Sequence, residues 1–208
     1  MENIVSLAKE RAELFNAKNV VVATNSGATA NLVLEVFGSN YNIYAVGNPS
    51  SAHERGLVHH TGVSEETRRR LEDRGIKVVL QDQSLFQTLG HDGTFHGSPL
   101  DEVVENAAPG GIYNTVAIIF NTLQLFGDAP RVYIEVTLMA ADSGLLPLDA
   151  DCISIARPSM WSKHHPDAAM ILRPAKTQDI FKRELRVKDL VLVPSKEDRW
   201  FSNGPMYW

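Results

Sequence analysis

Cysteine is almost absent from this chain of 208 residues, and long hydrophobic runs are absent altogether. The single cysteine, Cys152, excludes an internal disulfide and suits a reducing compartment. No apolar stretch approaches the length needed to span a bilayer, and the first residues follow the pattern of an amphipathic helix rather than a signal peptide. We therefore expect a cytoplasmic protein that does not bind a membrane.

Excess positive charge is also lacking, because the net charge is −5 and is spread along the chain. The basic run Arg68–Arg70 follows Glu65 and Glu66 on a predicted helix, where a solvated face explains it better than phosphate contacts. We expect no nucleic-acid partner.

Recognised metal-binding motifs are missing too. The seven histidines show no spacing such as H-E-x-x-H, and the adjacent His59 and His60 cannot easily turn both rings toward one ion. We expect no metal.

Strand and helix patterns alternate through the first two thirds of the chain, which predicts a parallel sheet with helices on both faces. The last predicted strands follow one another with little helix between them, so an antiparallel hairpin is expected at one sheet edge. Residues 1–208 are expected to form a single domain. The predicted strands are Val20–Ala23, Asn42–Val46, Ile76–Leu80, Arg131–Val136, Asp151–Ile155, Ala168–Leu172 and Leu190–Val193, and the predicted helices include Ala28–Phe37, Ser64–Arg74 and Ile112–Phe126.

The segment from Val20 to Val33 carries the strongest functional signal. A short β-branched run leads into Thr24, Asn25, Ser26, Gly27, Ala28 and Thr29, and apolar residues then recur with helical spacing. Small side chains at a helix start leave room for an anion to reach the free N–H groups of the first turn. The alternative is that Thr24 or Ser26 only caps the helix. The turn lacks the lysine of a Walker A sequence and does not match GxGxxG, so local chemistry leaves both interpretations open.

The Thr-x-Ser-Gly-x-Thr-Ala pattern at Thr24–Ala30 resembles the C-terminal α/β domain of pyruvate kinase, in which the equivalent loop holds a phosphate of a sugar bisphosphate. A closer resemblance is to stand-alone, mainly archaeal relatives of that domain. The blocks that carry it are the loop itself, Gly111–Tyr113, Asn121–Gly127, Ile134–Leu145 and Ile171–Ala175.

This resemblance implies a three-layer α/β/α sandwich with a mostly parallel mixed sheet. Some of these relatives carry flavin mononucleotide (FMN), so FMN is the implied cofactor. The resemblance also implies a ligand site around the Thr24–Thr29 turn, and Asp167 matches an aspartate of the relatives. Further candidates for this site are polar residues at or after the other predicted strands: Asn48, Gln83, Glu135 and Asp142.

The chain departs from its relatives in the walls of that site. Gly47-Asn48 and Asp82-Gln83 stand where Thr-His pairs are expected, and the loop Ala156–Asp167 is bulkier and more basic than the glycine-rich turn of many relatives. The phosphate end of the site is thus retained, whereas the part that would contact the rest of the ligand differs.

Two carboxylates lie in an apolar context, Glu135 at the end of a predicted strand and Asp142 in the small-residue stretch after it. Each could accept a hydrogen bond from a ligand, act as a base, or hydrogen-bond neighbouring backbone, and the structural role is the first expectation. Cys152 lies in an alternating run and is expected to be buried rather than a nucleophile.

The aromatic tail Trp200–Trp208 is expected to pack on its own domain or on a second subunit, which predicts a homo-oligomer.

We therefore expect a protein that binds a phosphorylated small molecule, with FMN as the named candidate. The alternatives are an enzyme acting on a phosphorylated metabolite, with catalytic residues unknown, and a domain that senses a sugar phosphate. The pyruvate kinase reaction is not implied, because a separate barrel domain carries it and this chain has no length left for one.

Overall fold

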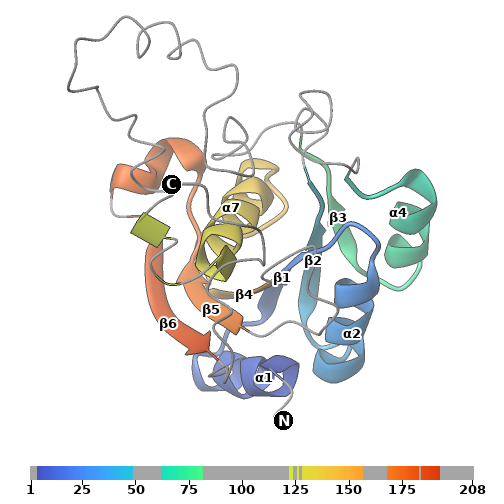
Figure 1. Cartoon of the computed structure of the whole chain (residues 1–208), viewed down its shortest axis with the longest axis horizontal. Helices are drawn as coiled ribbons and strands as arrows, with labels where there is room; N and C mark the ends of the chain where they lie inside the picture. Colours follow the sequence, from blue (N-terminus) through green and yellow to red (C-terminus); the bar gives the residue numbers. More distant parts are fainter. Residues whose placement is uncertain are drawn as a thin grey trace, which may run out of the picture.

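The computed structural model describes residues 4–48, 62–81, 122–123, 126, 128–156, 168–182 and 184–192. These residues form one six-stranded sheet with helices on both faces (Figure 1). The strands are β1 (Asn19–Ala23), β2 (Asn42–Val46), β3 (Lys77–Val79), β4 (Cys152–Ala156), β5 (Ala168–Arg173) and β6 (Arg186–Leu192). The helices are α1 (Ile4–Leu14), α2 (Ala28–Phe37), α4 (Glu65–Glu72) and α7 (Asp128–Asp142), with a 3-10 helix η1 (Thr177–Lys182).

The strand order is β3-β2-β1-β4-β5-β6. The first four strands in this order pair in parallel, whereas β5 is antiparallel to both β4 and β6. The predicted mixed sheet and the antiparallel hairpin at one edge are therefore confirmed.

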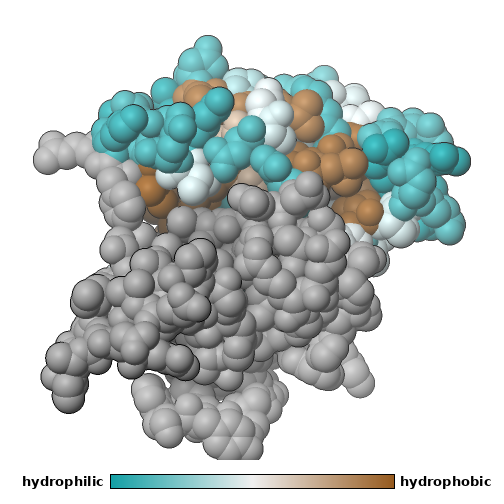
Figure 2. Space-filling model, turned by 90° about the horizontal axis from the view of Figure 1, so that it is seen from above, coloured by the Kyte–Doolittle hydropathy of each residue, from teal (hydrophilic) through white to brown (hydrophobic). Residues whose placement is uncertain are grey.

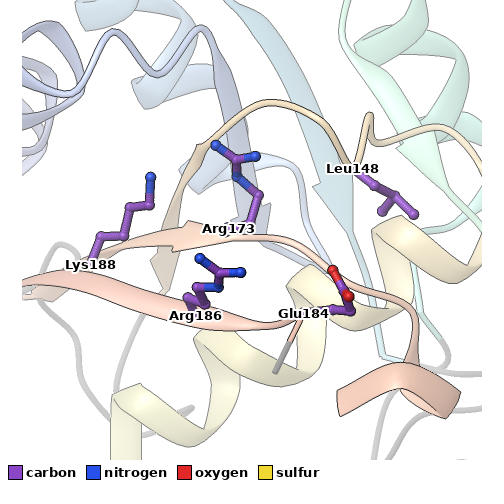
Figure 3. A pocket seen from close by; sticks show the side chains of 5 residues that line it. All are labelled: Leu148, Arg173, Glu184, Arg186 and Lys188. Atoms are coloured by element: carbon purple, nitrogen blue, oxygen red, sulfur yellow. The ribbon is translucent and has the colours of Figure 1, made fainter. Parts of the chain in front are cut away.

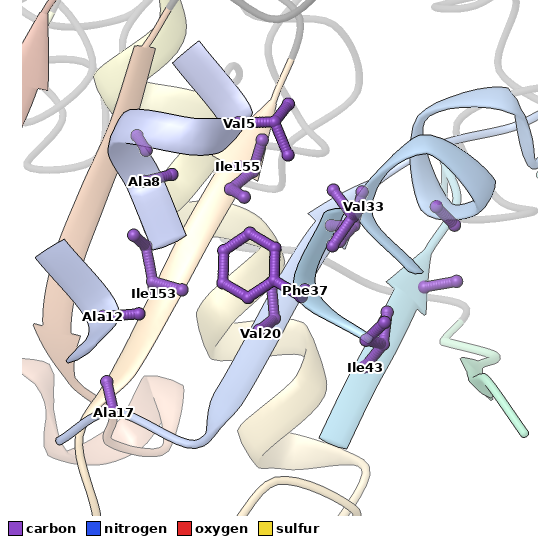
Figure 4. Close-up of a cluster of buried hydrophobic side chains, with 14 of the residues drawn as sticks. Val5, Ala8, Ala12, Ala17, Val20, Val33, Phe37, Ile43, Ile153 and Ile155 are labelled. Carbon is purple, nitrogen blue, oxygen red and sulfur yellow. The ribbon is translucent and has the colours of Figure 1, made fainter. Parts of the chain in front are cut away.

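Two apolar cores lie on opposite faces of the sheet. Side chains alternate along each strand, so in β1 Val20 and Val22 join one core while Val21 joins the other. The first core is covered by α1, α2 and α4, and Figure 4 shows Val5, Val33 and Phe37 gathered over β1 and β4. The second core is covered by α7. This arrangement confirms the three-layer α/β/α fold.

The N-terminal segment forms the helix α1. Its residues Ile4, Val5 and Ala8 are buried, whereas Leu14 is 71% exposed. Leu14 is the last residue of α1, where the chain turns away before β1.

The segment Arg131–Val136 is helical, so its prediction as a strand is wrong. It lies inside α7, whose buried residues Tyr133, Ile134, Thr137, Leu138 and Ala141 recur with helical spacing. The packing of this face on β1, β2, β4 and β5 overrides the strand propensity of the β-branched run.

The arginine run on α4 is a solvated face, as expected. Arg68 and Arg69 pair with Glu65 at 3.1 and 2.9 Å on the exposed side of the helix. Ser64 caps α4 by accepting a hydrogen bond from the backbone N–H of Thr67 at 3.2 Å.

Candidate functional site

The candidate site begins where β1 ends. β1 and β4 are parallel neighbours, and the helices next to them in the chain, α2 and α7, cover opposite faces of the sheet. In open α/β sheets a crevice forms at such a point, outside the carboxyl ends of the strands, and ligands bind there. The predicted turn Thr24–Thr29 lies at this place in the fold.

Hydrogen bonds within the turn fix its shape. The backbone N–H of Thr24 donates to the carbonyl oxygen of Val46 at 2.8 Å, which ties the turn to β2. The residue Thr24 is 9% exposed, and its hydroxyl accepts a hydrogen bond from the N–H of Gly27 at 3.0 Å. The Ser26 hydroxyl accepts from the N–H of Ala28 at 3.4 Å in an exposed position. Thr24 therefore shapes the turn, while Ser26 lies at its surface.

The first turn of α2 has no side-chain cap. Its N-cap residue is Gly27, which has no side chain to accept a hydrogen bond. Among the residues that the structure describes, none accepts from the N–H groups of Thr29 and Ala30. These donors and the partial positive charge of the helix start remain available to an anion. The capping alternative thus holds only in part, because the hydroxyls bond to Gly27 and Ala28 rather than deeper in the helix.

Gly27 allows the turn to pack closely against α4. Its φ of +82° lies in the left-handed region, and a Cβ at this position would lie 3.1 Å from Thr67 Cγ2 and 3.3 Å from Leu71 Cδ2. Glycine is required here by both the backbone conformation and the close approach of α4.

Two predicted site residues meet at the ends of β1 and β2. The backbone N–H of Asn48 donates to Asn25 Oδ1 at 2.9 Å. Behind Asn48 the chain is tightly packed, because a Cβ on Gly62 would lie 2.4 Å from the Asn48 carbonyl oxygen. The Asn25 side chain therefore couples the phosphate-loop candidate to the segment that follows β2, an interaction that the sequence did not reveal.

Glu135 lies on α7 rather than at a strand end. Its side chain is 16% exposed, and a carboxylate oxygen lies 3.8 Å from Arg131 Nη1. Ser154 donates to the carbonyl oxygen of Tyr133 at 3.4 Å, which places this part of α7 beside the middle of β4. Glu135 thus forms an ion pair with Arg131 within α7, on the face of the sheet opposite α2.

Asp142 lies near the amino end of β4, whereas the Thr24–Thr29 turn lies at the carboxyl end of the parallel strand β1. Tyr133 contacts Ser154, and Thr137 contacts Cys152 further along the helix, so α7 runs antiparallel to β4 and ends beyond its amino end. There the Asp142 carboxylate accepts from the backbone N–H and the hydroxyl of Thr177, at 2.9 and 2.6 Å. The structure does not bring Asp142 together with the Thr24–Thr29 turn, from which the length of β4, roughly 13 Å, separates it.

Gln83, Asp167 and all seven histidines lie outside the described residues. Within the described part of the chain, no group of three or more His, Cys, Asp or Glu residues is placed to hold a metal ion.

The helices that can be described include none that is both long and apolar enough to cross a bilayer. On the face seen in Figure 2, the described surface mixes hydrophilic and hydrophobic side chains.

A comparison with protein families agrees with the α/β fold class. Residues 2–90 match the family described as pyruvate kinase, alpha/beta domain. The matched segment contains α1, β1, the Thr24–Thr29 turn, α2, β2, α4 and β3, so it includes the described part of the candidate phosphate site. Residues 2–90 are thus similar to the pyruvate kinase C-terminal α/β domain, and the part of the chain that the structure describes has an α/β fold.

Proposed function

We propose that this protein is a cytoplasmic homo-oligomer that binds a phosphorylated small molecule, with FMN as the leading candidate. The phosphate would lie against the Thr24–Thr29 turn. The observation that carries the proposal is the uncapped start of α2 at the carboxyl end of β1, next to the topological switch point.

The available donors indicate how a phosphate would be held. The backbone N–H groups of Thr29 and Ala30 have no acceptor among the described residues, and the hydroxyl of exposed Ser26 lies beside them in the turn. The Thr24 hydroxyl already accepts a hydrogen bond from the N–H of Gly27, so it stabilises the turn. Anions at helix starts gain from both hydrogen bonds and the helix dipole.

Ser26→Asp tests the proposal. The substitution places a fixed negative charge where the phosphate would lie, so FMN binding should weaken by about 2 kcal/mol or more, because charge-assisted hydrogen bonds are lost. Riboflavin, which lacks the phosphate, should bind wild type more weakly than FMN and should be less affected by the substitution. Fluorescence titration measures both ligands, and the absorption spectrum of the purified protein shows whether a flavin is already bound.

Ser39→Asp is the matched control. Ser39 is exposed just beyond the other end of α2, so the variant has the same net charge without a charge in the turn. It should bind FMN like wild type. Equal binding of FMN and riboflavin by wild type, or equal losses in both Asp variants, would refute a phosphate site in this turn. Binding of a sugar bisphosphate in place of FMN would keep the site and change the ligand.

A further inference from the structure

A cationic side chain of α4 lies beside the start of α2. The two helices are neighbours on the same face of the sheet (Figure 1). Thr67 and Arg70 are three residues apart on α4, and Arg74 follows four residues later in the turn that ends the helix, so the three share one side. The Thr67 methyl carbon would lie 3.1 Å from a Cβ on Gly27, and Arg74 Nη1 donates to Asn31 Oδ1. Arg70 therefore lies between two contacts that join α4 to the first turns of α2.

The Arg70 side chain points toward the candidate phosphate turn. β1, β2 and β3 are parallel, and α2 and α4 lead into the amino ends of β2 and β3, so both helices start at the edge of the sheet where this turn lies. Long side chains on a helix point back toward its N-terminus. Arg70 does so, because its Nη2 donates to Thr67 Oγ1 at 3.1 Å. That hydroxyl is bonded to the same carbon as the methyl group that approaches Gly27, so the guanidinium group lies next to the Thr24–Thr29 turn.

Arg70 differs from the other arginines of its run in its partner. Arg68 and Arg69 both pair with the Glu65 carboxylate, at 3.1 and 2.9 Å. In the part of the chain that the structure describes, the Arg70 side chain is exposed and forms its one hydrogen bond with the neutral hydroxyl of Thr67. Among these residues no carboxylate offsets its charge, and a guanidinium group has further N–H donors for a ligand.

Two cations near the amino end of β4 show the opposite situation. Arg173 and Lys188 line a hollow of about 150 Å³, which Figure 3 shows. Asp151 accepts hydrogen bonds from Arg173 Nε at 2.6 Å and from Lys188 Nζ at 2.5 Å, so one carboxylate already binds both cations. This network ties the start of β4 to β5 and β6. Arg70 is therefore the better candidate to bind an anionic ligand.

We propose that Arg70 binds the phosphate at the Thr24–Thr29 turn and makes this site prefer the doubly ionised form of a phosphate monoester. The inference rests on the function proposed above, because it requires a phosphate at the start of α2. A helix start supplies only about half a positive charge, whereas a phosphate monoester carries about −1.5 to −2 at pH 7. The full charge of Arg70 offsets more of it, and the paired N–H groups of a guanidinium suit two phosphate oxygens. The alternative is that Arg70 only stabilises α4 through Thr67.

Fluorescence titration with FMN tests the proposal, and riboflavin serves as the ligand without a phosphate. Arg70→Gln should weaken FMN binding by about tenfold or more, because a charge-assisted hydrogen bond is lost. Riboflavin binding should stay unchanged. Arg69→Gln is the matched control, since Arg69 is the adjacent residue of α4, is 73% exposed and carries the same charge. It should bind FMN like wild type.

The pH dependence separates a direct contact from a structural role. Between about pH 5 and about pH 7 the FMN phosphate gains its second negative charge, so wild type should bind FMN more tightly at the higher pH. This gain should be smaller in Arg70→Gln and should be kept in Arg69→Gln. Arg70→Lys retains the charge without the planar group, so it should recover part of the affinity. Circular dichroism shows whether each variant is folded.

The outcomes distinguish this inference from the proposed function. If Ser26→Asp weakens FMN binding while Arg70→Gln and Arg69→Gln bind FMN equally well, the turn is a phosphate site to which Arg70 does not belong. If Arg70→Gln loses FMN and riboflavin equally, Arg70 acts through the structure of α4, and the proposal is also overturned. If wild type binds FMN no better than riboflavin, the phosphate site itself is refuted, together with the role of Arg70.

Discussion

Cys152 illustrates how position, rather than residue type, decides chemistry. The side chain is fully buried in β4, as the alternating sequence pattern predicted. Burial, with a smaller contribution from the charge of Asp151, raises the pKa of the Cys152 thiol to about 12, although the neighbouring hydroxyl of Thr137 opposes the shift. The thiolate that nucleophilic chemistry requires is therefore absent at neutral pH.

The folded protein should not react with Ellman's reagent at pH 8, whereas the urea-unfolded chain should react with one equivalent. The reason is that the unfolded thiol is exposed and ionises near pH 9.0. The absorbance of the coloured thiolate that the reagent releases follows the reaction. Rapid labelling without urea would show that β4 opens or that the thiol is exposed.

The same pKa shift has a consequence for stability at alkaline pH. The unfolded chain loses the thiol proton above about pH 9, whereas the folded chain keeps it until about pH 12. Unfolding therefore releases a proton in this window, and the contribution of Cys152 to stability falls as pH rises, by about 1.4 kcal/mol per pH unit.

At the level of elements, the junction between β1 and α2 depends on Gly27. Gly27→Ala should destabilise the protein by about 1–2 kcal/mol for the left-handed backbone, with a further cost of about 1 kcal/mol because the new methyl group meets Thr67 and Leu71. Urea unfolding followed by circular dichroism measures the difference in the free energy of unfolding.

Gly75→Ala separates the two costs. Gly75 has a similar φ of +80°, but a Cβ at this position would have no atom within 4 Å, so only the backbone cost applies. The Gly27 variant should be the less stable of the two. Equal losses would mean that α4 does not pack closely against the turn.

The elements differ in how far the sequence could predict them. β2 and α2 have the predicted bounds, because their ends are marked by turn residues such as Gly38. The helix α7 was mistaken for a strand, since Arg131–Val136 alternates and is rich in β-branched residues. The helical spacing of Tyr133, Thr137 and Ala141 was the signal that could have corrected this.

The candidate site was predictable only where it is local. The turn Thr24–Thr29 is a continuous segment, so its small residues and its place before a helix can be read from the sequence. The Asn25–Asn48 contact depends on the parallel register of β1 and β2, and the position of Asp142 depends on the direction of α7. Neither can be inferred from residue types alone.

For the whole molecule, we expect a dimer or a larger assembly. The basis is the aromatic tail Trp200–Trp208, which lies outside the described residues. Size-exclusion chromatography with light scattering should give a mass at least twice that of the 23.0 kDa chain. A variant that lacks residues 200–208 should shift toward monomer if the tail covers a second subunit. A full-length monomer whose tail is cleaved rapidly by protease would contradict the prediction.

The packing of α1 bears on how the protein is made. This helix, close to the N-terminus, packs against β4, β5 and β6, and its Arg11 pairs with Asp189 of β6 at 3.6 Å. During translation α1 therefore leaves the ribosome long before its partners in residues 168–192 have been synthesised. Its apolar side chains, including Ile4, Val5 and Ala8, must wait for the last strands of the sheet. Contacts of such long sequence separation slow folding, so the nascent chain cannot complete its first core before residues 168–192 have been synthesised.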